Sequence, residues 1–310
     1  GAILRIVEHK DATEAQRRIG EINTGILVAG AANLRRWLAE LDNDNAQSEY
    51  YLTDVIAMAA AEGLPISSAQ AEAAVEILGV NDKLQLSIVE RAYQRRQAEA
   101  LMHAGVTLMD PERIDLRGTL SMGRDVTIDI NVVIEGEVSL GDGTYVGPNT
   151  VLTNVQVGSE VQILPNCVIE DAVIGDRCRV GPFTRIRPQT RLGREVHLGN
   201  FVELKKSTVE DGSKINHLTY VGDTAVGRKV NIGAGTIVCN YDGANKYPTV
   251  IEDEAFIGSD TQLVAPVRIG KGATIGAGST ITRDAPAGKL TLARGRQTTV
   301  EGWQRPKKKE

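Results

Sequence analysis

The sequence is poor in the features that commit a chain to a membrane, to nucleic acid or to a disulfide-stabilised fold. No apolar run is long enough to span a bilayer, and a net charge of −5 gives no general attraction to nucleic acid. The three cysteines (Cys167, Cys178 and Cys239) are odd in number and form no CxxC pair. They therefore indicate reduced core residues and predict a cytoplasmic location. Aromatic residues make up only 4% of the chain, which suits a core too narrow for many rings.

What the sequence does contain is a six-residue repeat of aliphatic residues between about Met122 and Ile281, many of them followed directly by glycine. A period of six is neither helical nor the alternation of a simple strand. It is typical of hexapeptide repeats, which build a parallel β-helix. Three hexapeptides form one coil of about 18 residues, and coils stack at the strand spacing of about 4.8 Å. Such coils are usually left-handed, an exception to the right-handed crossover rule. A β-sandwich would not keep this phase for so long.

Three segments of different character are expected. Residues 1–83 show a short α/β pattern, with expected strands at residues 4–7 and 25–28 and expected helices at residues 33–41 and 54–61. Residues 84–104 form a charged amphipathic segment that we interpret as a linker helix. Residues 105–310 hold the repeat and, after it, an extended C-terminal arm. The predicted fold is mainly β: a left-handed parallel β-helix preceded by a linking helix and a partial α/β domain.

The register of the repeat predicts a cluster of cations. Arg187 directly follows Ile186, and Lys205 directly follows Leu204 without a slip in phase. The two cations are therefore expected at one corner of successive coils, roughly 5 Å apart. Cations this close repel each other unless an anion or a carboxylate lies between them. An anion site, most simply for phosphate, is one interpretation; a surface pair neutralised by acids elsewhere is the other.

The same register places a histidine near this corner. After a five-residue step, Glu203 and Tyr220 are expected to stack just before the cations, and His217 is expected above Asn200 on the face that leads to them. These side chains are predicted to converge. A histidine beside an anion site is a candidate general base, although a lone histidine is more often structural.

Two further features point to a ligand. Residues 239–248 interrupt the repeat with a turn at Asp242-Gly243, and loops on a rigid scaffold often carry function. Lys246 on this loop could reach an anion, or the loop is a harmless insertion. Ser259 and Ala277 are 18 residues apart, so small side chains are expected to stack on one edge and leave a shallow groove for an extended ligand.

Several motifs resemble a known family. Residues 216–220 (NHLTY), 230–236 (VNIGAGT), 239–246 (CNYDGANK) and 258–262 (GSDTQ) lie in the repeat. Residues 7–12 (VEHKDA), 21–25 (EINTG), 50–54 (YYLTD) and 79–81 (GVN) precede it. Together they resemble the bacterial bifunctional N-acetylglucosamine-1-phosphate uridylyltransferase/glucosamine-1-phosphate N-acetyltransferases. The resemblance covers essentially the whole chain.

The resemblance implies that the β-helix transfers acetyl from acetyl-CoA to the amine of glucosamine-1-phosphate, on the route to UDP-N-acetylglucosamine for peptidoglycan and lipopolysaccharide. His217 matches the general base of the family. The sugar-phosphate contacts match Arg187, Lys205, Tyr220, Asn231 and Lys246. The acetyl-CoA contacts match Ala234, Asn240, Tyr241, Ser259, Ala277 and Arg294. The resemblance also implies a homotrimer with active sites between subunits.

The first segment departs from the family pattern. Residues 1–83 resemble the C-terminal part of a uridylyltransferase domain, which uses UTP and Mg²⁺. The Gly-rich nucleotide loop, its Arg and Lys, and the metal-binding Asp are absent. Glu8 and Asn23 match nucleotide-sugar contacts, and Asn81 matches both such a contact and a metal ligand, so the implied site is incomplete. These 310 residues are expected to lack uridylyl transfer.

Three alternatives have different consequences. A β-helical carbonic anhydrase needs three zinc-binding histidines, but the column offers only His197 and His217, at different positions in the coil. A non-catalytic trimeric scaffold would not need the His217 cluster or the loop, and neither would a β-helix that only regulates a nucleotidyltransferase. An acetyltransferase for another amino sugar would keep both features.

Overall fold

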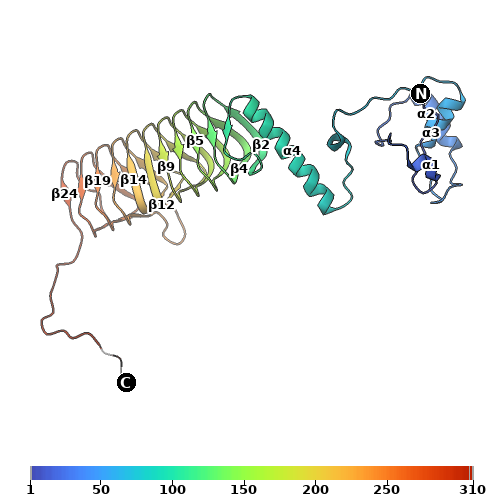
Figure 1. Ribbon diagram of the computed structural model, residues 1–310. Helices are drawn as coiled ribbons and strands as arrows, with labels where there is room; N and C mark the ends of the chain where they lie inside the picture. Colours follow the sequence, from blue (N-terminus) through green and yellow to red (C-terminus); the bar gives the residue numbers. More distant parts are fainter. Residues whose placement is uncertain (1, 307, 309–310) are drawn as a thin grey trace. The chain divides into compact units, whose positions relative to one another are not determined.

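A computed structural model describes residues 2–306 and 308 of the chain (Figure 1). The chain forms two compact units, Gly1–Val89 and Glu90–Glu310. Helix α4 (Lys83–His103) crosses the boundary between them, in the segment from which a linker helix was expected. No helix among the described residues combines the length and the apolar character that a membrane crossing requires.

The first unit is helical where it is regular. It contains α1 (Glu14–Arg17), α2 (Ala31–Glu40), α3 (Asp54–Ala61) and the 3₁₀ helix η1 (Ala74–Ile77), so the two helices expected at residues 33–41 and 54–61 are confirmed. The strands expected at residues 4–7 and 25–28 are wrong, because neither segment is in a strand. Ile26 and Val28 are 78% and 99% exposed, and a β-prone segment without a pairing partner does not form a stable strand.

A small core holds α2 and α3 together. Trp37, Val55 and Ala59 are its buried members. The indole of Trp37 donates a hydrogen bond to Glu62 (2.9 Å), and Arg36 forms an ion pair with the same carboxylate. The Arg36 guanidinium, with the indole, lowers the pKa of Glu62 to about 2. This unit therefore depends on a few side chains rather than on a repeated pattern.

The second unit is a parallel β-helix, which confirms the fold predicted from the repeat. Its strands make three faces, A, B and C, and in each face a strand pairs in parallel with the strand one coil away. Figure 1 shows the strands stacked as a column. The inward residues of face B include Ile186, Leu204 and Val221, all fully buried. The aliphatic repeat therefore supplies one continuous core, because each coil buries its apolar residues against its neighbours.

Each face has its own short strands, and longer strands turn a corner from one face to the next. Face A contains β1 (Thr107–Leu108), β3 (Thr127–Ile128), β5 (Tyr145–Val146), β7 (Gln162–Ile163), β9 (Arg179–Val180), β16 (Asn231–Ile232), β19 (Phe256–Ile257), β22 (Thr274–Ile275) and β24 (Leu290–Thr291). Face B contains β10 (Arg185–Ile186), β17 (Ile237–Cys239), β20 (Gln262–Val264) and β23 (Thr280–Ile281). Face C contains β11 (Thr190–Leu192), β13 (Thr208–Val209), β15 (Thr224–Val226), β18 (Thr249–Ile251) and β21 (Val267–Ile269). From B to C run β2 (Ile114–Met122), β4 (Val132–Leu140), β6 (Val151–Val157) and β8 (Val168–Ile174); from A to B run β12 (His197–Lys205) and β14 (Lys214–Gly222).

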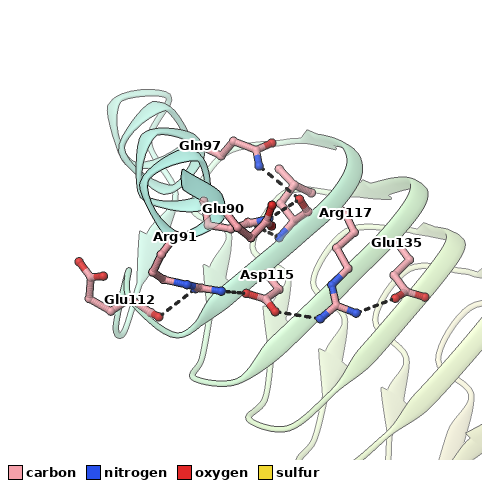
Figure 2. A network of polar contacts seen from close by, with 9 residues as sticks. Glu90, Arg91, Gln97, Glu112, Asp115, Arg117 and Glu135 are labelled. Atoms are coloured by element: carbon pink, nitrogen blue, oxygen red, sulfur yellow. Dashed lines mark hydrogen bonds and ion pairs between the residues drawn. The ribbon is translucent and has the colours of Figure 1, made fainter. Parts of the chain in front are cut away.

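Helix α4 closes the first coil of the column. The buried amide of Gln94 accepts a hydrogen bond from Leu116 N–H (2.8 Å) and donates one to Leu116 C=O (3.1 Å), as a neighbouring strand would. Figure 2 shows the polar chain beside this contact, from Arg91 through Asp115 and Arg117 to Glu135. The helix thus satisfies strand groups that would otherwise form an open sheet edge.

Candidate active site

Two corners of the column flank face B, and they hold most of the candidate residues. The corner between faces A and B carries His217, Ala234, Ser259 and Ala277 on successive coils; we call it the histidine corner. Each of these residues lies two positions after a core isoleucine, and these isoleucines pair in register, from Ile215 to Ile275. The corner after face B carries Arg187 and Lys205; together with Lys246 it is called the cation corner.

The histidine corner is continuous along the column. The carbonyls of His217, Ala234 and Ser259 accept hydrogen bonds from the N–H groups of Gly235 (3.3 Å), Asp260 (2.7 Å) and Gly278 (2.9 Å). The expected stacking of Ser259 and Ala277 is confirmed, and the structure adds His217 and Ala234 to the same line. The sequence already contained this signal, namely the constant offset of two residues from the core isoleucine.

The Arg294 side chain extends this line. Its Nη1 donates a hydrogen bond to the carbonyl of Ala277 (2.9 Å). Ser259 and Ala277 are exposed and small. An exposed edge of small side chains that ends at a guanidinium can take an extended ligand with an anionic end.

His217 presents an exposed side chain on a fixed backbone. Asn200 is its register partner on the preceding coil, as predicted. The hydroxyl of Thr219 donates a hydrogen bond to the His217 carbonyl (2.6 Å), and Leu218 between them has a φ of +48°. The turn therefore fixes the direction in which the imidazole leaves the column.

The cation corner concentrates positive charge. Arg187 N–H donates to the Leu204 carbonyl (2.9 Å), so Arg187 and Lys205 occupy successive coils, as predicted. Lys246 is close enough to interact with Lys205: its ammonium and then desolvation lower the pKa of Lys205, and Arg187 adds to this effect. Arg187 also pairs with Glu203 (Nη1 to Oε1, 2.9 Å). Three cations gather here, and of the three only Arg187 has a direct ion pair within the described part of the chain, that with Glu203, which is the electrostatic character of an anion site.

A small hairpin brings Lys246 to this corner. Residues 239–248 leave the column between β17 and β18. Tyr241 and Lys246 form an antiparallel bridge, and the Asp242 carboxylate accepts the N–H groups of Ala244 (2.8 Å) and Asn245 (2.6 Å). These bonds also lower the pKa of Asp242. The loop is therefore an ordered turn that carries one cation.

Tyr220 lies on face B between the two corners. It pairs in register with Glu203, as predicted. A Cβ added at Gly222 would lie 2.4 Å from the Tyr220 hydroxyl and 2.9 Å from Nδ2 of Asn240. Only glycine leaves room for both groups there, so the phenol and the amide of Asn240 meet above the backbone of Gly222.

The candidate residues border one face but do not all touch one another. Gly222 is the register partner of Lys205, and five residues separate it from His217. At strand geometry this is at most roughly 16 Å, and the turn at Leu218 shortens it. His217 and the cations were expected to converge, but they lie on opposite edges of face B. A ligand would have to span the face to contact both.

Two residues implied by the resemblance lie outside face B and the histidine corner. Asn231 is on face A, where it pairs with Lys214 and Phe256, so the single chain does not bring it to the cation corner. Tyr241 is exposed on the hairpin, and its hydroxyl donates to the Gly243 carbonyl (2.5 Å).

The three candidate residues of the first unit come from three separate segments. The Thr53 hydroxyl donates to Glu8 (3.1 Å), Asn23 is exposed, and Asn81 N–H donates to Gln85 (2.6 Å). Among residues 2–306 and 308, no group of three or more His, Cys, Asp or Glu side chains is arranged to hold a metal ion. Glu8, Asn23 and Asn81 supply one carboxylate and two neutral amides, so they do not by themselves provide the metal-binding Asp that the family's Mg²⁺ site was expected to need.

Comparisons with known proteins agree with this picture. The family model described as GMPPB C-terminal domain matches residues 116–202. The model described as bacterial transferase hexapeptide (six repeats) matches residues 248–283. Among curated proteins, the chain is 60% identical to a bifunctional protein GlmU of Ralstonia nicotianae over 310 residues, which is all of this chain and 68% of the relative. It is also 60% identical to the bifunctional protein GlmU of Methylococcus capsulatus, over 99% of this chain and 67% of the relative.

The chain is also similar, at lower identity, to solved structures of UDP-N-acetylglucosamine acyltransferases. A UDP-N-acetylglucosamine acyltransferase of Francisella novicida is 18% identical, covers 62% of this chain and 66% of its own, and gives a TM-score of 0.28. The identity to the curated relatives extends over both units of the chain.

Proposed function

The chain belongs to the family of bifunctional GlmU proteins, and from that membership we propose that its β-helix transfers the acetyl group of acetyl-CoA to the amine of glucosamine-1-phosphate. The product is N-acetylglucosamine-1-phosphate, a precursor of UDP-N-acetylglucosamine. The observation that carries the proposal is the pairing of an exposed histidine with three cations across a single face of the column.

The two corners divide the substrate between them. Arg187, Lys205 and Lys246 bind the phosphate by charge-assisted hydrogen bonds. The sugar lies over Tyr220 on face B, and its amine points to His217. With long cationic side chains reaching from one edge and the imidazole from the other, a sugar phosphate bridges the distance of at most roughly 16 Å between the two backbone positions.

The reaction is an acyl transfer to nitrogen. The substrate ammonium has no lone pair, so His217 first removes one of its protons. The free amine attacks the thioester carbonyl and forms the new C–N bond. The C–S bond then breaks, the coenzyme A thiolate takes the proton held by His217, and the new amide nitrogen loses its second proton to solvent. Binding both substrates at fixed positions on a rigid ladder supplies the orientation that this step needs.

The acetyl-CoA contacts are assigned along the histidine corner. Ala234, Ser259 and Ala277 line the edge, and Arg294 lies at its end. Asn240 and Tyr241 come from the base of the hairpin. A backbone N–H or a polar side chain near Asn240 stabilises the oxyanion.

The remaining assignments follow from the family. A homotrimer, with active sites between neighbouring columns, would bring Asn231 of another copy toward the cation corner. A cytoplasmic location suits both substrates.

The domains are assigned from the same family. Residues 1–83 belong to the uridylyltransferase domain, with Glu8, Asn23 and Asn81 as nucleotide-sugar contacts. Residues 84–104 link the domains, and residues 105–310 form the acetyltransferase domain. No step proposed here passes through Mg²⁺.

A free-thiol assay with acetyl-CoA and glucosamine-1-phosphate tests the proposal. We expect thiol release that depends on the sugar phosphate, with N-acetylglucosamine-1-phosphate as the acetylated product by mass spectrometry. A folded protein that releases no thiol with glucosamine-1-phosphate but does so with another amino sugar has a different substrate. Release with neither class of sugar identifies a scaffold without this activity.

A further inference from the structure

Asp223 is an acidic residue beside the cation corner that the proposed reaction does not use. It lies between β14 and β15, in the left-handed region with a φ of +49°. Its side chain is only 11% exposed, and one carboxylate oxygen is 3.8 Å from Nζ of Lys206. A carboxylate that is nearly buried destabilises the folded state unless hydrogen bonds and a nearby positive charge compensate for its lost hydration.

Its contacts connect two coils and both ends of the hairpin. Asp223 N–H donates to the carbonyl of Lys205 (2.9 Å), which ties it to the cation corner. Its Oδ2 accepts a hydrogen bond from Nδ2 of the buried Asn240 (2.5 Å), where the hairpin begins. Its carbonyl accepts from Thr249 N–H (3.2 Å), where the hairpin ends. One residue therefore fastens both ends of the segment that carries Lys246.

The hairpin needs such a fastening. It is closed on itself, because Tyr247 N–H donates to the Asn240 carbonyl (2.9 Å), so its direction depends on its base. That direction places Lys246 beside Lys205, and the Lys246 ammonium lowers the pKa of Lys205. Repulsion between two like charges opposes this placement of the hairpin. The Asp223 carboxylate counters this repulsion, since it attracts Lys205 while it holds Asn240.

We propose that Asp223 is a positioning residue for the anion site: it holds the hairpin so that Lys246 meets Lys205, and it offsets the repulsion between the two ammonium groups. The site is thus preorganised before the sugar phosphate arrives, which lowers the cost of binding. This inference rests on the proposed function for its substrate, but the positioning of the hairpin can be measured without any reaction.

The chain offers a matched control in Asp171. It lies two positions after the core residue Ile169 on face B, as Asp223 lies two positions after Val221. It is also in the left-handed region, with a φ of +41°. Its carboxylate likewise accepts a hydrogen bond from an asparagine, Nδ2 of Asn154 (3.0 Å). No hairpin leaves its coil.

The first readout is amide hydrogen exchange in the full chain. In Asp223→Ala we expect the amides of Tyr247 and Thr249 to exchange at least about tenfold faster, whereas Asp171→Ala leaves them unchanged. Asp223→Asn keeps an acceptor for Asn240 and should show a smaller increase. Exchange in Asp223→Ala equal to that of the unmodified protein would overturn the inference, whether or not the protein transfers acetyl groups.

The second readout is kinetic. We expect Asp223→Ala to raise KM for glucosamine-1-phosphate about tenfold and to leave KM for acetyl-CoA within about twofold. In a protein that already has Lys246→Ala, Asp223→Ala should raise KM for glucosamine-1-phosphate little further, because both residues act through the hairpin. Equal effects of Asp223→Ala with and without Lys246 would contradict positioning. Faster exchange without any acetyl transfer by the unmodified protein would retain the positioning and reject the proposed function.

Discussion

The two corners that flank face B are built on the same ladder, yet they have opposite characters. The histidine corner is a line of small residues, the half-buried Ala234 and the exposed Ser259 and Ala277, that begins at one imidazole. The cation corner gathers Arg187, Lys205 and Lys246. In the proposed function, the width of one face therefore separates the proton-transfer group, His217, from the cations that bind the phosphate.

The largest effect is expected from removing the imidazole at the histidine corner. His217→Ala should lower kcat by about 10²–10⁴-fold, because general-base catalysis contributes that much. His197→Ala is the control, since it removes a histidine from face A of the preceding coil. Both variants are measured by thiol release. Equal losses of kcat would mean that neither imidazole acts as the base.

The next largest effect is expected at the cation corner. Lys205→Ala should raise KM for glucosamine-1-phosphate by about 10–100-fold, since a hydrogen bond to a charged group contributes about 1.5–3 kcal/mol. Arg177→Ala, which removes a cation paired with Glu195, should leave that KM within about twofold. If KM for acetyl-CoA rose in Lys205→Ala while that for the sugar did not, the two corners would be wrongly assigned.

A bulky residue on the histidine corner should affect the other substrate. Ser259→Phe is expected to raise KM for acetyl-CoA roughly tenfold, at a cost of about 1–3 kcal/mol for a clash, with little change in KM for the sugar phosphate. Val264→Phe adds the same side chain after face B on the same coil. Initial rates with each substrate varied in turn separate these outcomes. The reverse pattern would place acetyl-CoA elsewhere.

The smallest effect is a pH signature of the cation corner. Lys246, with desolvation, lowers the pKa of Lys205 below its ordinary value of 10.5. The charge on Lys205 is therefore fully present well below that lowered pKa and is lost as pH rises through it. In Lys246→Gln the loss should begin at higher pH, because the like charge is gone. KM for glucosamine-1-phosphate measured from neutral to alkaline pH reports this. The same onset in both proteins would contradict the coupling.

The column was predictable from the sequence because each repeat carries its own inward residue and meets its partner at a fixed spacing. The register alone placed Glu203 beside Tyr220 and His217 above Asn200. The same logic fails in the first unit, where Ile26 and Val28 have β-branched side chains but no strand to pair with. Local preference does not specify a strand whose hydrogen bonds lie outside it.

The position of Lys246 could not be predicted from the repeat. It depends on a hairpin closed by the Asp242 carboxylate and fastened by Asp223 to Asn240. These are side-chain bonds between residues without a common period. The separation of His217 from the cations by the width of face B became clear only from the register partner of Lys205, which is Gly222.

The central claim is that a sugar phosphate binds across face B, with its phosphate at the cation corner and its amine at His217. The most direct measurement is the ratio of kcat/KM for glucosamine-1-phosphate to kcat/KM for glucosamine, in the unmodified protein and in Lys205→Ala. The account predicts a strong preference for the phosphorylated sugar that falls at least about tenfold in the variant, because the phosphate loses a charge-assisted contact. An unchanged preference in Lys205→Ala would contradict it.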